Sequence, residues 1–236
     1  MIKVGIYKYL KRFIDFIMSL FLIVFLSPII LIVSILIKLT SKGPVLFKQE
    51  RTGKDGKNFF VYKFRSMHVD NDVLDFTEED RTTPIGKFIR KTSLDEIPQL
   101  INILKGEMSF IGPRPWITEY AKYFTKQQMR RLEVRPGLTG YAQCMGRNGI
   151  SVIQKINYDI EYVDNFSLVM DLKIIFLTLY TVLMAKNAEG NKNIIKQEIE
   201  DLKVQKVENG FKKKSKKKVA SKKNKMKVLD YEKSLV

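Results

Sequence analysis

Cysteine, histidine and tryptophan are almost absent from this chain of 236 residues, since each occurs only once. With Cys144 alone, the chain cannot form an internal disulfide or a thiolate zinc cluster, and this cysteine content is compatible with the cytoplasm. A single histidine, His68, argues against a histidine-rich metal site. The sequence shows no internal repeat, and its length suits one domain of ordinary size with its own core.

Acidic residues are too few to balance the basic ones, because 25 Asp and Glu stand against 42 Lys and Arg, giving a net charge of +17. Such a charge implies a polyanionic partner, and nucleic acid, anionic lipid and phosphorylated substrates all qualify. Residues 186–236 hold 16 lysines, no arginine and 7 acidic residues, which is +9 of the +17. This low-complexity stretch cannot bury enough apolar surface to fold, so we predict a disordered tail.

One long apolar run, residues 13–37, follows a short basic segment, residues 1–12. As a single helix it would be about 37 Å long, enough to cross the ~30 Å hydrocarbon core of a bilayer. Ser27-Pro28 lies past the middle of the run and predicts a kink. Cationic residues flank both ends, which favours the cytoplasm for both. The pattern alone leaves two interpretations open, a transmembrane helix and a re-entrant hairpin.

Residues 45–67 show the pattern of a β-hairpin, with Asp55-Gly56 as the turn between two apolar runs. Lys63 and Arg65 alternate with aromatic and apolar residues in the second run. Such a charged face is more often solvated, but in an active site it can hold phosphate.

The central candidate site is residues 90–99, where Asp95 and Glu96 follow two cations, Arg90 and Lys91, in the sequence. An apolar stripe across residues 94–104, at three- and four-residue spacing, predicts a helix that ends at Gly106. This helix would carry Asp95 and Glu96 in its first turn.

Both a functional and a structural interpretation of the acid pair are open. Backbone N–H groups at a helix start favour anions, and Arg90 and Lys91 add positive charge. However, Ser93 and Glu96 also have capping-box spacing, and Pro98 is compatible with a helix start.

Further loops contain arginines suited to phosphate. In Gly112-Pro113-Arg114-Pro115 the two prolines fix the backbone around a guanidinium that can bind phosphate or a nucleobase edge. A glycine-punctuated region, residues 135–149, offers Arg147 as a second candidate phosphate contact. The last apolar helix, residues 168–184, is too short in its purely apolar part to span a membrane, so we expect it on the core or in the membrane interface.

Five motifs in a fixed order resemble those of the bacterial sugar transferase family, the monotopic polyprenyl-phosphate phosphoglycosyl transferases, in their minimal catalytic form. The resemblance covers about residues 8–185. The motifs are GPVLFKQER at residues 43–51, YKFRSM at 62–67, RKTSLDEIPQLIN at 90–102, KGEMSFIGPRP at 105–115 and RPGLTG at 135–140.

The resemblance implies roles for individual residues. Asp95 would be the nucleophile and Glu96 would help to hold Mg²⁺. The pair Ser27-Pro28 would break the membrane helix and return the chain to the cytoplasmic face. The substrate-binding residues would be Lys63, Arg65, Arg90, Arg114 and Arg147.

We therefore expect an α/β fold that is mostly helical with a small β-hairpin or sheet. We expect it to associate with the membrane through an N-terminal re-entrant helix–break–helix and interfacial helices. Residues 1–40 would form the basic N-terminus and re-entrant helix, 41–185 the cytoplasmic catalytic domain with interfacial helices, and 186–236 the lysine-rich tail. The expected location is the cytoplasmic face of the bacterial inner membrane.

The implied reaction moves a sugar-1-phosphate from a UDP-sugar to polyprenyl (undecaprenyl) phosphate, releases UMP and starts a surface glycan. Residues 146–171 look most like those of members that use N-acetylated amino sugars. Anionic membrane lipids are further expected partners, and the oligomeric state stays open. A nucleic-acid binder is disfavoured because the basic tail lacks interleaved aromatics. A non-catalytic anchor or scaffold of a glycan-assembly complex remains the alternative.

Overall fold

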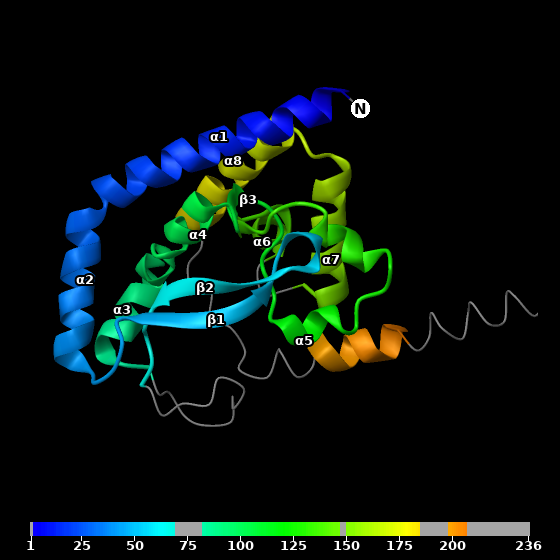
Figure 1. The fold of residues 1–236 in the computed structure, drawn as a ribbon. Coiled ribbons are helices and arrows are strands. Elements are labelled where there is room, and N and C mark those ends of the chain that lie inside the picture. Colours follow the sequence, from blue (N-terminus) through cyan, green and yellow to red (C-terminus); the bar gives the residue numbers. More distant parts are fainter. Residues whose placement is uncertain (1, 69–81, 147–149, 185–197, 207–236) are drawn as a thin grey trace, which may run out of the picture.

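The structure, a computed structural model, describes residues 2–68, 82–146, 150–184 and 198–206, and is mostly helical with small two-stranded sheets (Figure 1). This agrees with the predicted α/β class. The helices are α1 Ile2–Phe25, α2 Ser27–Thr40, α3 Pro84–Lys91, α4 Gln99–Lys105, α5 Thr118–Ala121, α6 Tyr141–Gly146, α7 Val152–Asp164 and α8 Leu168–Met184. The strands are β1 Leu46–Thr52, β2 Asn58–Phe64, β3 Ser109–Ile111 and β4 Gly137–Thr139, and the 3-10 turns are η1 Lys54–Gly56, η2 Leu94–Glu96 and η3 Gln128–Leu132.

Helices α1 and α2 form a bent pair along one side of the molecule (Figure 1). They meet at Leu26 with a bend of 60°. Pro28 stands in the first turn of α2, where its missing N–H costs no helical hydrogen bond, so the predicted kink at Ser27-Pro28 is present. Within the described residues, no single helix is long and apolar enough to cross a bilayer. The two helices of this bent pair are long and apolar enough only when they are counted together.

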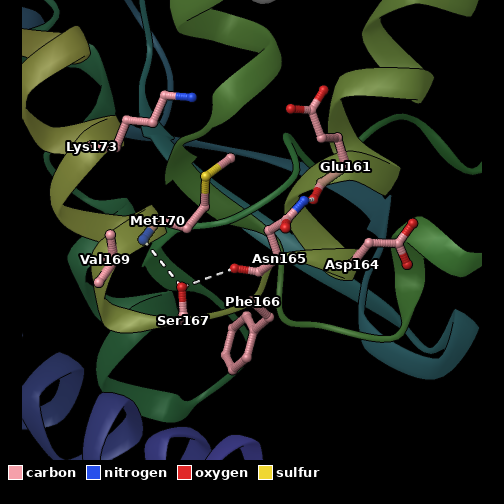
Figure 2. Close-up of a pocket in the computed structure, with 8 residues that line it drawn as sticks. All are labelled: Glu161, Asp164, Asn165, Phe166, Ser167, Val169, Met170 and Lys173. Atoms are coloured by element: carbon pink, nitrogen blue, oxygen red, sulfur yellow. Dashed lines mark hydrogen bonds between the residues drawn. The ribbon is translucent and has the colours of Figure 1, made fainter.

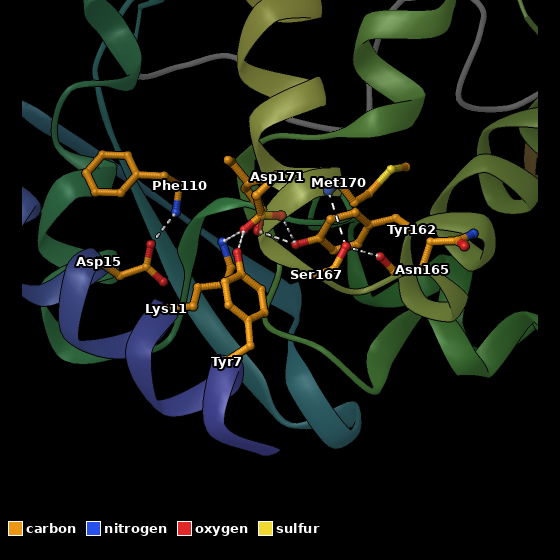
Figure 3. A network of polar contacts seen from close by, with 10 residues as sticks. Tyr7, Lys11, Asp15, Phe110, Tyr162, Asn165, Ser167, Met170 and Asp171 are labelled. Atoms are coloured by element: carbon orange, nitrogen blue, oxygen red, sulfur yellow. Dashed lines mark hydrogen bonds and ion pairs between the residues drawn. The ribbon is translucent and has the colours of Figure 1, made fainter. Parts of the chain in front are cut away.

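The N-terminal half of α1 is tied to the rest of the molecule by polar side chains (Figure 3). Asp171, in the first turn of α8, accepts hydrogen bonds from Lys11 Nζ at 2.6 Å, from Tyr162 at 2.8 Å and from the hydroxyl of Tyr7. Arg12 donates to two carbonyls of the last turn of α4, at 2.7 and 2.8 Å. These bonds fix α1 against the elements that surround the acid pair.

Strands β1 and β2 form the predicted antiparallel hairpin, in register from Leu46 opposite Phe64. The turn Lys54–Gly56 contains Asp55 and Gly56 with φ of 56° and 76°, a left-handed conformation that Asp-Gly sequences tolerate. The hairpin turn predicted at Asp55-Gly56 is therefore confirmed.

Strands β3 and β4 pair in parallel, with Ser109 opposite Gly137 and Ile111 opposite Thr139. The backbones come very close here, because a Cβ built on Gly137 would lie 2.1 Å from the backbone nitrogen of Gly112. Only glycine fits at this contact, which fixes the start of the loop that follows β3.

Two apolar clusters pack the acid-pair region against the hairpin. Through the first, α2 and α3 contact the end of β2, and through the second, α4 contacts the middle of β2. The buried members of the first are Val33, Ile37, Phe64 and Ile89, and those of the second are Val61, Leu100, Ile103 and Met108.

Residues 198–206 form a helix that packs beside α5 and α7 (Figure 1). Leu202 is buried in their apolar cluster, and Glu198 accepts hydrogen bonds from Tyr120 at 2.7 Å and Lys155 at 2.6 Å. This differs from the predicted disorder of the whole tail, because the segment has apolar side chains that reach an existing cluster. The rest of the tail lies outside the described residues.

Candidate active site

Asp95 and Glu96 lie on the short turn η2 between α3 and α4. Ser93 has a left-handed backbone conformation, with φ of 57°, which turns the chain just before the acid pair. The prediction that the pair lies in the first turn of a helix over residues 94–104 is therefore wrong, since α4 begins only at Gln99. The capping-box interpretation also fails, because the Ser93 side chain makes no capping hydrogen bond.

Two cations from distant segments contact this pair. Lys63 Nζ, from β2, lies 2.6 Å from Glu96 Oε1 and 3.9 Å from Asp95 Oδ2. Arg114, from the loop after β3, reaches the same Glu96 Oε1 at 3.3 Å. The exposed fraction of the side chain is 13% for Asp95 but 47% for Arg114, so the cluster opens to solvent on the arginine side.

The two carboxylates differ in their electrostatics. Burial is the largest influence on Glu96 and raises its pKa, but Arg114 and Lys63 together outweigh burial and bring the pKa to about 2. Burial also raises the pKa of Asp95, and the charge of Glu96 adds to this, in spite of Lys63 and Arg90. Glu96 is thus a firmly ionised anion, whereas the ionised form of Asp95 is less strongly stabilised.

The position of Lys63 relative to the acid pair is set by Asn102 of α4. Its side chain accepts from the N–H of Tyr62 at 3.1 Å and donates to the carbonyl of Phe60 at 2.7 Å. Asn102 is fully buried, so these bonds hold without competition from water. They join β2 to α4, the helix that comes after the acid pair in the sequence.

The other predicted substrate-binding residues are placed differently. Arg65 is buried and donates to the backbone of residues 41–42, so the structure does not bring it to the acid pair. Arg90 is exposed in the last turn of α3 and acts on Asp95 through its charge. Arg147 lies outside the described residues, so its phosphate contact stays a prediction.

Arg51, near the end of β1, is a further cation whose charge interacts with those of Glu96 and Arg114, and we predicted no role for it from the sequence. Burial is the main cause that lowers its pKa to about 10, the nearby charge of Arg114 lowers it further, and Glu96 acts in the opposite direction. The sequence could have indicated Arg51 through its position in β1, because β1 pairs with β2, the strand that carries Lys63.

The acid pair fits the ligands that magnesium accepts. Mg²⁺ is commonly held by one or two carboxylates together with substrate phosphates, rather than by a complete protein cage. Both cation contacts of Glu96 described above use Oε1, not Oε2. In the described part of the chain, no cluster of three or more His, Cys, Asp or Glu side chains suits a metal ion. Asp95 and Glu96 therefore suit a magnesium ion that arrives with a phosphate ligand.

A separate open pocket of about 500 Å³ lies where α7 meets α8 (Figure 2). Inside it Ser167 Oγ donates to the carbonyl of Asn165 at 3.0 Å and accepts from the N–H of Met170 at 3.2 Å, which caps the start of α8. None of the residues lining this pocket belongs to the acid pair or its cations. The charged cluster, rather than this pocket, is the candidate site.

The sequence of the chain matches known proteins over most of its length. The family profile described as bacterial sugar transferase matches residues 6–185 of the chain. The sugar transferase EpsL of Bacillus subtilis is 44% identical over 187 residues, which are 78% of this chain and 93% of that protein.

The names of other relatives state a reaction. The UDP-glucose:undecaprenyl-phosphate glucose-1-phosphate transferase of Klebsiella pneumoniae is 43% identical over 196 residues, covering 78% of this chain and 42% of that protein. The UDP-N-acetylgalactosamine-undecaprenyl-phosphate N-acetylgalactosaminephosphotransferase of Aeromonas hydrophila is 40% identical over 188 residues, covering 75% and 44%. The chain thus spans less than half the length of these two relatives.

Proposed function

The chain belongs to the bacterial sugar transferase family, and on this basis we propose that it transfers a sugar-1-phosphate from a UDP-sugar to polyprenyl phosphate and releases UMP. The observation that carries the proposal is the contact of two adjacent carboxylates with cations from two other segments. Phosphoryl transfer needs clustered positive charge to neutralise phosphate oxygens, and covalent catalysis needs a group that attacks phosphorus. Both requirements are met within this cluster.

The proposed reaction has two steps. First, a carboxylate oxygen of Asp95 attacks the phosphorus that bears the sugar. The bond from this phosphorus to the bridging oxygen breaks, the bridging oxygen keeps the electron pair, and UMP leaves. Second, an oxygen of polyprenyl phosphate attacks the same phosphorus, and Asp95 leaves as a free carboxylate.

The remaining residues of the cluster prepare the phosphates for attack. Lys63 and Arg114 offer charged donors to the phosphate oxygens, with Arg114 at the solvent-facing, nucleotide end. We place magnesium at Glu96, whose low pKa keeps it ionised. When bound, the metal supplies neutralisation of the charge on the transferring phosphate.

For the donor, we propose a UDP-linked N-acetylated amino sugar, from the resemblance of residues 146–171 to members that use such sugars. The named relatives include one glucose enzyme and one N-acetylgalactosamine enzyme, so a panel of UDP-sugars is the direct test. We expect kcat/KM for a UDP-N-acetylamino sugar to exceed that for UDP-glucose. A preference for UDP-glucose would overturn this choice of donor.

We also propose that the chain lies on the cytoplasmic face of the bacterial cytoplasmic membrane, because the acceptor is a lipid and the donor is soluble. Helices α1, α2 and α8 present many exposed apolar side chains, which suits burial in the membrane interface. The largest exposed fractions are those of Tyr9, Val24, Phe25, Leu39, Val169 and Phe176.

The decisive test of the reaction is UMP release by purified protein with UDP-sugar, undecaprenyl phosphate and Mg²⁺. We expect release that stops when the metal is chelated. A folded protein that binds membranes but releases no UMP from any UDP-sugar would favour the scaffold alternative instead.

A further inference from the structure

A buried ion pair lies behind the loop that carries Arg114. It joins Arg131 of η3 to Asp159 of α7, with Nε and Nη2 of Arg131 at 3.0 and 2.7 Å from Asp159 Oδ2. Only 1% and 2% of the two side chains are exposed. Well-packed apolar residues are often as stabilising as such a pair. Stability alone is therefore a weak explanation for this ion pair.

Arg131 makes one more hydrogen bond, and this bond reaches the active site. Its Nη2 donates to the backbone carbonyl of Arg114 at 2.8 Å, while the side chain of Arg114 contacts Glu96. The guanidinium of Arg131 also lies over the ring of Trp116, 4.3 Å from its centroid. Asp159 on one edge and the indole on one face thus hold Arg131 in a fixed orientation.

The backbone on either side of Arg114 is held by other main-chain groups. Gly112 donates to the carbonyl of a β4 residue, and the carbonyl of Pro113 accepts from another, both at 2.9 Å. The carbonyl of Trp116 accepts from the last residue of β1 at 3.0 Å. Between these points, the carbonyl of Arg114 is held by a side chain, that of Arg131.

We propose that Arg131, oriented by Asp159, is a positioning residue that fixes the backbone of Arg114 and so aims its guanidinium at Glu96 and the substrate phosphates. This role rests on the proposed function. Arg131 is too deeply buried to touch substrate itself, and it acts through Arg114. A displacement of about 1 Å in such a contact can cost about a hundredfold in rate.

The first test removes the pair without leaving an unpaired buried charge, by combining Arg131→Met with Asp159→Leu. We expect a Tm close to that of the wild type, a fall in kcat of about tenfold to a hundredfold, and faster amide hydrogen exchange in residues 112–117 but not in the hairpin. A matched control is the exposed neighbouring pair, Arg130 and Asp164, changed in the same way. The control should keep the wild-type kcat and exchange.

A double-mutant cycle with Arg114→Ala separates positioning from general support of the fold. If Arg131 acts through Arg114, removing the buried pair in the Arg114→Ala background should cost less than twofold in kcat. Fully additive losses, or wild-type exchange in residues 112–117 of the pair-free variant, would overturn the positioning role. Absence of UMP release from the wild type would instead overturn the proposed function, and the exchange measurement would still decide the role of Arg131.

Discussion

At the scale of single residues, the acid pair shows how two neighbouring carboxylates acquire different properties. Glu96 receives two cations on one oxygen and has a pKa of about 2. Asp95 has Lys63 at the longer distance of 3.9 Å, and its pKa is raised by burial and by Glu96. Environments that separate two pKa values in this way usually mark different chemical roles. They are consistent with Glu96 as a ligand for metal and Asp95 as the attacking group.

Substitution of Asp95 by Asn tests the nucleophile. We expect UMP release to fall by about a thousandfold or more, because an amide cannot attack phosphorus. Folding should be preserved, since burial already disfavours the charged form of this side chain. The measurements are turnover, the Tm, and the mass of protein mixed with UDP-sugar and Mg²⁺ without acceptor. A phospho-sugar adduct on the wild type that is absent from Asp95→Asn supports the role, and near-normal turnover by the folded variant would end it.

The pH profile of kcat/KM tests the link between Lys63 and Asp95. Asp95 must be ionised to attack, so activity should fall as pH falls through its pKa. Lys63 lowers that pKa, and Lys63→Met should therefore move the acid limb to higher pH. Lys57→Met, an exposed change in the hairpin turn, is the control and should leave the limb in place. An unmoved acid limb in Lys63→Met would show that Lys63 does not act on the titrating group.

At the scale of elements, the sequence correctly predicted those turns and helix ends that depend on neighbouring residues in the chain. The hairpin turn at Asp55-Gly56 and the stop at Gly106, with φ of 83°, depend on residues that tolerate a left-handed backbone. The last helix has the predicted bounds, Leu168–Met184, because its apolar run begins and ends sharply.

Other features depend on contacts that no local pattern reveals. Serine does not signal a left-handed conformation, so the turn at Ser93 that separates the acid pair from α4 was missed. Lys63 and Arg65 share a face by strand alternation, yet β2 ends at Phe64 and Arg65 turns to another part of the chain. Arg131 finds its partner 28 residues away, and neither residue belongs to a recognisable motif.

The helix at residues 198–206 is an element beyond the region that matches the family profile. Leu202 is 1% exposed in an apolar cluster that includes Trp116, next to the Arg114 loop. We expect Leu202→Ala to lower the free energy of unfolding by about 2 kcal/mol or more, through lost burial and the cavity left behind. Urea unfolding and hydrogen exchange of residues 198–206 measure this.

A control for this prediction lies in the same helix. Val204 is 52% exposed, so Val204→Ala should change the stability by no more than about 0.5 kcal/mol. Equal effects of the two substitutions, or wild-type exchange of the helix in Leu202→Ala, would contradict the docking of this segment.

At the scale of the whole molecule, the candidate active site is assembled from three separate segments of the chain. Lys63 comes from the hairpin, the acid pair from η2, and Arg114 from the loop after β3. The bent pair α1 and α2 contacts the rest of the molecule at both ends. Near the N-terminus Lys11 of α1 pairs with Asp171 of α8, and near the end of α2 Ile37 packs in the apolar cluster with Phe64 and Ile89. The apolar helices and the charged site are therefore parts of one packed body.

This packing bears on how the chain meets a membrane. A helix that crossed the bilayer would carry one of its ends away from the domain that follows it. Here α1 is about 36 Å long, yet its Lys11 forms a 2.6 Å ion pair with Asp171, and after a 60° bend α2 still packs against the same body. We therefore predict that both ends of the bent pair lie on the cytoplasmic side. The cationic residues at both ends favour the same arrangement.

Cysteine labelling of intact cells tests this topology, with Cys144→Ser as the background because Cys144 is the only cysteine of the chain. Lys8 and Lys57 are exposed, at the start of α1 and in the hairpin turn, and each is replaced by Cys in turn. A membrane-impermeant thiol reagent should label neither variant in intact cells and both after lysis, because a re-entrant segment keeps both positions inside. Labelling of Lys8→Cys but not Lys57→Cys from outside would mean that the segment spans the membrane. It would also mean that the ion pair of Lys11 with Asp171 does not form there, since the two residues could not then lie on the same side.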